Sequence, residues 1–260
     1  MKAELLKPEE SRSDSTVIMV HGYRGTMKRA LFRELTKKYL AEGVRVVHVS
    51  YKEANEEENI PFRDKAAFLL QIEEKLGEGK KIWVGHSLGR ATIAAALHGT
   101  SSPKGHVIIG ICGAKTVDEV KQSYLNHANV VGEPASEVSE TKKDKQGKYL
   151  EIPTAWKSSM PENYLEGKMD TNGITTLDFH HGQDPIVKIK SPTFTLNFAD
   201  SYPPAKLPKP GGNKKVRLDW PAIEAPAERR KPKFSHTHLI EDEGQAGRLA
   251  ELIISTRFHK

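Results

Sequence analysis

The sequence predicts an α/β protein with a mostly parallel central sheet flanked by helices. Short apolar runs alternate with helical patterns through the first half of the chain, and glycines follow where the helices should end. Strands separated by helices of about 10–15 residues are typical of βαβ units, which build parallel sheets. A chain of 260 residues can bury one large core, so residues 1–260 are expected to form a single domain.

Four strands and three helices are expected before residue 112. The strands are the apolar runs 16–20, 44–49, 81–84 and 106–111. Apolar residues at helical spacing predict helices from Leu31 to Leu40 and from Phe62 to Leu76, the first ended by Gly43 and the second by Gly77 and Gly79. The alanine-rich stretch from Ala91 to Leu97 predicts a third, buried helix.

Two insertions are expected in the second half of the chain. Residues 122–172 are polar, lysine-rich and weakly periodic, and so long an irregular stretch inside a compact domain is typical of an inserted cap or lid. Strands are expected at 174–179 and 193–198, the latter as the last strand. Residues 201–234 form a second insertion, rich in proline and lysine, and 239–258 contain a final amphipathic helix.

The motif Gly85-His86-Ser87-Leu88-Gly89 directly follows a predicted strand and directly precedes the alanine-rich helix. This setting suits a reactive serine, because the sharp turn tolerates only small neighbours and lifts the hydroxyl above the sheet edge. The amide that follows the serine then lies at a helix N-terminus, where partial positive charge favours an oxyanion.

The motif resembles the nucleophile elbow of the α/β-hydrolase fold family, in particular its lipase and esterase branch. His21-Gly22, after the first strong strand, resembles the oxyanion-loop motif of that family, and residues 182–187 (Gly-Gln-Asp-Pro-Ile-Val) resemble its acid loop. The resemblance covers nearly the whole chain except the two insertions. It implies a serine hydrolase that cleaves carboxylic esters through an acyl-enzyme.

Carried over position by position, the resemblance implies a role for five residues. Ser87 is the nucleophile, Asp184 orients and stabilises the imidazole, and His238 is the base. The backbone N–H groups of Tyr23 and Leu88 form the oxyanion hole.

Alternatives remain open for the acid and for the base. Asp178, inside a predicted strand, and Asp200, at the end of another, are rival acids. His236 is the rival base; His238 is favoured because the family usually places an apolar pair and then an acidic residue after its histidine, as residues 239–242 do here.

No metal and no cofactor is expected. His180-His181 with Asp184, or His236 with His238, would supply zinc-ligand types, but neither group sits on an obvious preformed site. The single cysteine, Cys112, excludes an internal disulfide and lies in an apolar run, which predicts a small buried side chain rather than a catalytic thiol.

Arg90 is unusual, because the family usually has a small residue there and because a cation in the first turn of a helix opposes the helix dipole. One hypothesis is that Arg90 and Arg24 face the mouth of the site and bind an anionic head group or carboxylate. The alternative is that both are surface cations with partners elsewhere.

Charge and composition limit the partners. The net charge of +6 is compatible with contact with an anionic surface, but no nucleic-acid-binding motif accompanies the basic residues. No apolar run approaches the ~18 residues that cross a bilayer, and the acidic, proline-containing start does not resemble a signal peptide, so a cytoplasmic protein is expected.

The expected lid favours a lipid-like or bulky ester as substrate. Acyl transfer, thioester cleavage and amide cleavage use the same machinery, and a non-catalytic binding protein that keeps the fold is the alternative from another class.

Overall fold

The computed structural model describes residues 1–23, 25–51, 60–98, 106–131, 142–152, 174–181, 184, 186–187, 194–199, 216–221 and 232–258. Its strands are β1 (Lys2–Leu6), β2 (Thr16–Val20), β3 (Arg45–Ser50), β4 (Lys81–His86), β5 (Val107–Ile111), β6 (Thr175–His181), β7 (Phe194–Ala199) and β8 (Val216–Pro221). Its helices are α1 (Ala30–Ala41), α2 (Phe62–Leu76), α3 (Leu88–Leu97), α4 (Val117–Val131), α7 (Pro232–Glu241) and α8 (Glu243–Ser255).

The strands form one sheet in the order β1-β3-β2-β4-β5-β6-β7-β8. β1 runs antiparallel to β3, and every other neighbouring pair is parallel. Val20 pairs with Gly85, Gly85 with Gly110, and Gly110 with Asp178, so β2, β4, β5 and β6 end at the same edge of the sheet. The expected mostly parallel sheet flanked by helices is confirmed.

The sequence missed two strands, both at the edges of the sheet. β1 is almost wholly exposed, and its mixed polar and apolar residues resemble those of a loop. β7 is not the last strand, because β8, inside the proline- and lysine-rich insertion 201–234, pairs with it. β8 does alternate apolar and polar residues, Val-Arg-Leu-Asp-Trp, a strand pattern that the prediction of a continuous insertion overlooked.

The first helices begin and end close to where the apolar spacing places them. Gly43 (φ 76°) and Gly77 (φ 66°) follow α1 and α2 in backbone conformations that favour glycine. In contrast, α4 extends to Val131, well into the expected cap 122–172. Of that insertion, 132–141 and 153–173 lie outside the described residues.

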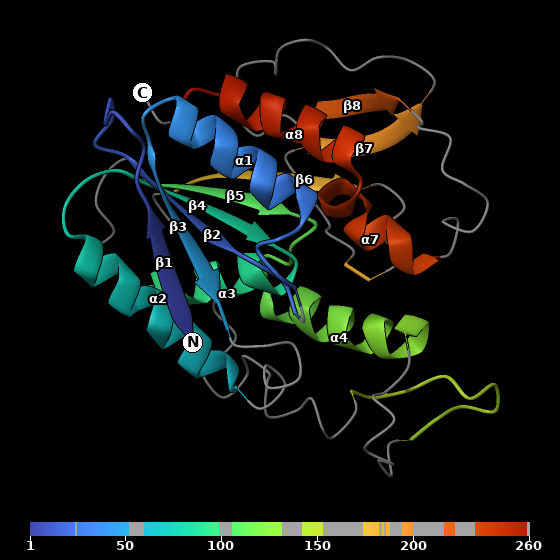
Figure 1. Ribbon diagram of the computed structural model, residues 1–260. Coiled ribbons are helices and arrows are strands. Elements are labelled where there is room, and N and C mark those ends of the chain that lie inside the picture. The colour runs from blue at the N-terminus through green and yellow to red at the C-terminus, as the bar shows by residue number, and fades with distance from the viewer. Residues whose placement is uncertain are drawn as a thin grey trace.

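Helices cover both faces of the sheet (Figure 1). Val17 and Met19 of β2 point into the core beneath α1 and α8, whereas Ile18 and Val20 point into the core beneath α2, α3 and α4. Burial on both faces explains why this strand is a continuous apolar run rather than an alternating one.

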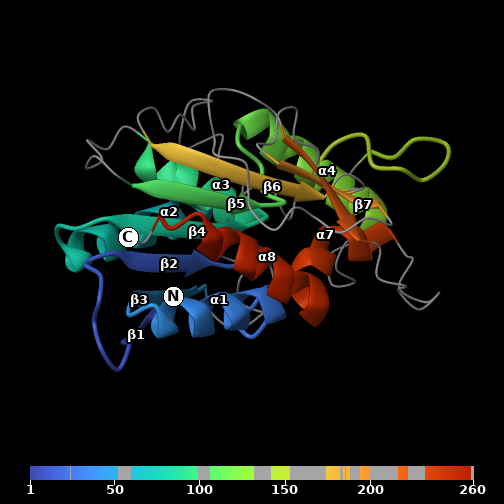
Figure 2. The same ribbon diagram turned by 90° about the horizontal axis from the view of Figure 1, so that it is seen from above.

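Two helices lie at the end of the sheet towards which β4, β5 and β6 run. Figure 2 shows α4 and α7 there. Arg29, just before α1, forms an ion pair with Glu241, the last residue of α7, and so ties this helix to the body of the domain. Functional groups carried by α7 are therefore held near the carboxyl ends of the strands.

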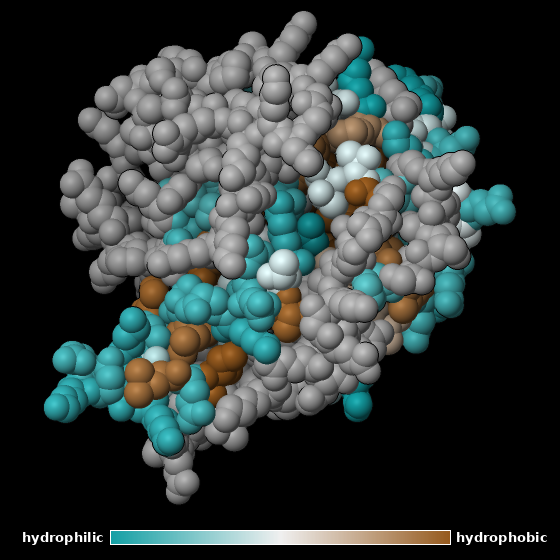
Figure 3. Space-filling model, turned by 180° about the vertical axis from the view of Figure 1, so that it is seen from behind, coloured by the Kyte–Doolittle hydropathy of each residue, from teal (hydrophilic) through white to brown (hydrophobic). Residues whose placement is uncertain are grey.

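The surface of the described part mixes hydrophilic and hydrophobic side chains (Figure 3). Its most exposed large hydrophobic residue is Leu150, at 60 % exposure. Leu150 lies in the segment 142–152, which is hydrogen-bonded to α4 through Asn129 and the backbone of Tyr149. None of the described helices is both long enough and apolar enough to cross a membrane.

Candidate active site

Ser87 forms a sharp turn between β4 and α3. Its backbone lies at φ 51° and ψ −122°, a conformation that non-glycine residues rarely adopt and that costs about 1–3 kcal/mol. The Ser87 N–H donates to the carbonyl of Ile111 at the end of β5, at 3.0 Å. This bond fixes the strained residue against the neighbouring strand.

The two glycines of the motif allow close backbone approaches. A Cβ added at Gly85 would lie 2.6 Å from the Arg90 Cα, and one added at Gly89 would lie 2.6 Å from the carbonyl oxygen of His21. Real Cβ atoms do not approach other atoms so closely, so neither position accepts a side chain without a backbone shift.

A continuous hydrogen-bonded chain leads away from the Ser87 hydroxyl. Ser87 Oγ lies 2.8 Å from His236 Nε2, and His236 Nδ1 donates to Asp184 Oδ2 at 2.7 Å. The other oxygen, Oδ1, accepts the N–H groups of Ile186 at 2.8 Å and Val187 at 3.0 Å. Asp184 therefore holds His236 in the tautomer that leaves Nε2 free to accept the serine proton.

The charge of Asp184 is stabilised by its partners. Burial alone would raise the pKa of this carboxyl, but the positive charge of His236 and the donors from His236, Val187 and Ile186 outweigh burial, and the pKa is lowered. Asp184 is therefore a carboxylate at neutral pH.

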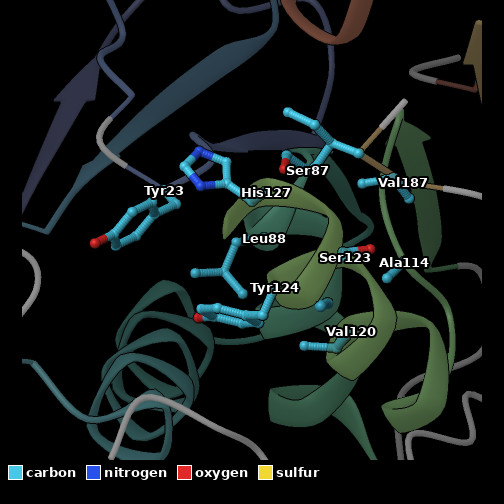
Figure 4. A pocket seen from close by; sticks show the side chains of 11 residues that line it. Tyr23, Ser87, Leu88, Ala114, Val120, Ser123, Tyr124, His127 and Val187 are labelled. Atoms are coloured by element: carbon cyan, nitrogen blue, oxygen red, sulfur yellow. The ribbon is translucent and has the colours of Figure 1, made fainter. Parts of the chain in front are cut away.

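An apolar pocket opens beside Ser87, and α4 forms one wall of it. Figure 4 shows the lining side chains, which are Tyr23, Ser87, Leu88, Ala91, Ala114, Val120, Ser123, Tyr124, His127, Ile186 and Val187. The space measures about 440 Å³ including its open mouth. Tyr23 contacts the rings of Tyr124 and His127, so the loop after β2 meets α4 across the pocket.

Leu88 and the loop that carries Tyr23 both lie beside Ser87. The Leu88 N–H opens α3 and has no acceptor within the helix. The loop that carries Tyr23 touches the turn, since a Cβ on Gly22 would lie 2.8 Å from the Ser87 Cβ.

The fold of this chain is similar to that of several solved structures. The esterase domain of a Rhodothermus marinus protein has a TM-score of 0.51 and 14 % identity, over 98 % of this chain and 90 % of that one. Acylaminoacyl peptidase from Pyrococcus horikoshii has a TM-score of 0.52 and 14 % identity, over 99 % of this chain and 39 % of that one. The chain has the α/β-hydrolase fold. No protein-family model matches the sequence. No curated protein matches it either.

The histidine favoured by the sequence analysis is not the one that contacts Ser87. The structure brings His236, not His238, to Ser87 and Asp184. The final helical region was expected from residue 239 onwards, but both histidines already belong to the helix α7.

Asp178, a rival acid, is engaged elsewhere. Its side chain is 1 % exposed, and its two oxygens pair with Arg90 Nε at 3.0 Å and Lys115 Nζ at 2.9 Å. Asp200, the other rival, lies outside the described residues.

Arg90 does not face the mouth of the site. Its side chain is 3 % exposed and lies in its ion pair with Asp178, which overturns the hypothesis that it binds an anionic head group. Gly110 and Gly113 make room for it, because a Cβ on either would collide with the arginine or the aspartate. Arg24 lies outside the described residues.

His86 is buried against the central histidine. Its Nε2 donates to the carbonyl of His236 at 3.3 Å, and the two ring centroids are 5.0 Å apart. Burial, reinforced by the charge of His236, holds the pKa of His86 well below its usual value. His86 is therefore a neutral donor that steadies the backbone of α7.

One grouping of potential metal ligands forms among the described residues, and it differs from those in the sequence prediction. Cys112, rather than His181, joins His180 and Asp184. Cys112 is fully buried, as expected, but its proximity to Asp184 had no local signal, because it arises from the pairing of β5 with β6.

Proposed function

We propose that this protein is a serine hydrolase that cleaves carboxylic esters through an acyl-enzyme. The observation that carries the proposal is the hydrogen-bonded chain from Ser87 through His236 to Asp184, anchored on a strained turn at a helix N-terminus. A serine hydroxyl is too weak an acid to react by itself at neutral pH, and an adjacent oriented imidazole is the usual means of activating it.

In the proposed reaction, Ser87 Oγ attacks the carbonyl carbon while His236 Nε2 takes its proton. Asp184 stabilises the resulting imidazolium. The oxyanion accepts hydrogen bonds from the N–H groups of Leu88 and Tyr23, each worth about 3–4 kcal/mol of barrier. His236 then protonates the departing alcohol, and a water molecule activated by the same histidine releases the acid.

The pocket favours an apolar acyl or alkyl group over a charged one. Leu88, Ala91 and Ile186 line the pocket, and α4 adds Val120. A charge buried against these side chains would lose its hydration.

A fluorophosphonate probe tests the proposed nucleophile. We expect stoichiometric labelling of the native protein and none of Ser87→Ala. Ser123→Ala is the matched control, because Ser123 also lines the pocket but donates its hydroxyl hydrogen to the carbonyl of Glu119, and it should label like the native protein.

Equal labelling of the native protein and Ser87→Ala would refute the proposal, and no labelling at all would favour a binding protein. The ester preference is tested with p-nitrophenyl esters of increasing chain length, set beside a matched thioester and anilide. Faster turnover of the thioester or the anilide would move the assignment to a thioesterase or an amidase.

A further inference from the structure

Three side chains able to bind a metal ion meet beside the proposed active site. Cys112 follows β5, His180 lies in β6 and Asp184 follows β6. The Cys112 sulfur, a ring nitrogen of His180 and a carboxylate oxygen of Asp184 lie within 4.8 Å of one another, and all three residues are buried. We propose that this cluster binds a thiophilic divalent metal ion, with Zn²⁺ as the type case, and that the bound ion inhibits the hydrolase proposed above.

The set of donor atoms suits zinc. Thiolate, imidazole and carboxylate are its three common protein ligands, at metal–ligand distances of about 2.0–2.3 Å. In a tetrahedral site such ligands lie about 3.5 Å apart, so the cluster would contract by about 1 Å around the ion. Three protein ligands leave a fourth position for water.

Both His180 and Asp184 can offer an atom to a metal ion while keeping their other hydrogen bonds. His180 Nδ1 is buried and has no hydrogen-bond partner among the described residues, which is rare for a buried polar atom. Asp184 accepts hydrogen bonds from Ile186, Val187 and His236, and the Cys112 thiol donates to the same carboxylate. When Cys112 gives up this proton, the acceptor position that it held becomes available to the metal ion. A metal ion can therefore bind without displacing His236.

The charges balance when the metal binds. Without metal, the Cys112 thiol keeps its proton and donates it in a hydrogen bond to the Asp184 carboxylate. On binding, a sulfur–metal bond replaces the S–H bond, and the proton leaves for solvent. One thiolate and one carboxylate then neutralise one divalent cation, which makes the buried complex electrically neutral.

Inhibition follows from the shared carboxylate, and this part of the inference rests on the proposed function. With a cation on Asp184, the negative charge that stabilises the His236 imidazolium is cancelled. His236 then becomes a weaker base towards Ser87, and acylation slows.

Cobalt absorption tests the site without using activity. Cys112 is the only cysteine in the sequence, so a thiolate-to-cobalt charge-transfer band can come from no other residue. We expect one equivalent of Co²⁺ to produce the band in the native protein and Zn²⁺ to abolish it by displacement. Cys112→Ala should give no band, and His180→Ala should weaken Co²⁺ binding by more than about tenfold.

His48→Ala is the matched control, because His48 lies on β3, outside the cluster, and bonds to Thr36 instead. It should bind Co²⁺ like the native protein, and Cys112→Ser serves as a second variant if Cys112→Ala does not fold. No band in the native protein with excess Co²⁺, or an unchanged affinity in His180→Ala, would overturn the proposal.

The effect of Zn²⁺ on labelling of Ser87 tests whether the bound metal ion inhibits the hydrolase. Saturating Zn²⁺ should slow fluorophosphonate labelling of the native protein more than about tenfold and leave Cys112→Ala unaffected. Equal inhibition of both proteins would place the metal elsewhere and refute the proposed mode of inhibition. The two proposals fail separately, since cobalt binding does not need a reactive Ser87, and labelling without metal needs Asp184 but neither Cys112 nor His180.

Discussion

His236 links Ser87 to Asp184 in the proposed machinery, and the helix α7 holds it in that position. Ser87 lies 149 positions before it and Asp184 lies 52 before it, so no local pattern links them. The sequence left two candidates for the base, His236 and His238. Only the tertiary structure shows that His236 contacts Ser87.

Replacing each histidine in turn tests this assignment. His236→Ala should lower the rate of ester hydrolysis by at least about 10³-fold, because serine activation is lost. His238→Ala should stay within about tenfold of the native rate. Initial rates with a p-nitrophenyl ester measure both, and a reversed pattern would restore His238 as the base.

Arg90 and Asp178 form a buried ion pair under the proposed nucleophile, and the two partners are not equivalent. Asp178 also pairs with Lys115, so it keeps a cation when Arg90 is removed. Arg90, in contrast, has a buried Nη1 without a hydrogen-bond partner among the described residues. Losing Asp178 would therefore leave a buried guanidinium uncompensated.

We accordingly predict unequal losses of stability. Asp178→Asn should lower the free energy of unfolding by about 3–5 kcal/mol, as for other buried pairs broken on one side, and Arg90→Met by less. Urea denaturation of the two variants and of the double variant measures both losses and their coupling. A larger loss in Arg90→Met would show that Lys115 does not compensate Asp178.

At the scale of elements, the turn between β4 and α3 depends on how closely α3 packs against the end of β2. Gly89, in the first turn of α3, lies against the backbone carbonyls of Val20 and His21. Backbone atoms in a central strand and its loop cannot move aside as a flexible side chain can. Gly247, inside α8, has nothing within 4 Å of an added Cβ.

This contrast gives a pair of matched substitutions. Gly89→Ala should lower the free energy of unfolding by about 1–3 kcal/mol, because the added methyl overlaps the end of β2. Gly247→Ala should raise it by about 0.5–1 kcal/mol, since alanine loses less backbone entropy in a helix. Thermal and urea denaturation measure both, and a neutral Gly89→Ala would mean that α3 can shift.

α4 is the element on which sequence and structure differ most for the site. Residues 122–131 were expected to be irregular, whereas they belong to a regular helix that forms a wall of the pocket. Its buried residues Val117, Val120, Tyr124 and Ala128 recur at helical spacing and pack against the core beneath α2 and α3.

At the scale of the whole molecule, the buried histidines make stability depend on pH. Burial lowers the pKa of His86, His180 and His48 in the folded state. Below the ordinary histidine value of 6.5, the unfolded chain therefore binds protons that the folded chain does not. The stability that these groups contribute is present above that pH and is lost as the pH falls.

We expect the free energy of unfolding to decrease from pH 7.5 to pH 5.5. His86 alone should contribute about 1.4 kcal/mol of that decrease, since it stays neutral in the fold one pH unit below its unfolded pKa. Urea denaturation at both pH values measures this decrease, and His86→Gln should show a smaller one by that amount. An equal decrease in the variant would mean that His86 is protonated in the folded protein.

The sequence by itself determined the class of fold, the central strands β2 to β6, the serine turn and the acid loop. These features are local, because a buried parallel strand is a continuous apolar run and a sharp strand–helix turn requires glycines at fixed positions.

The tertiary structure decided which histidine reaches Ser87, that Arg90 is buried against Asp178, that α4 walls the pocket, and that Cys112 lies beside Asp184. The exposed edge strand β1 belongs to the same group. In every case the contact joins residues that are distant in sequence. Only the pairing of strands and the packing of helices against the sheet bring these residues together.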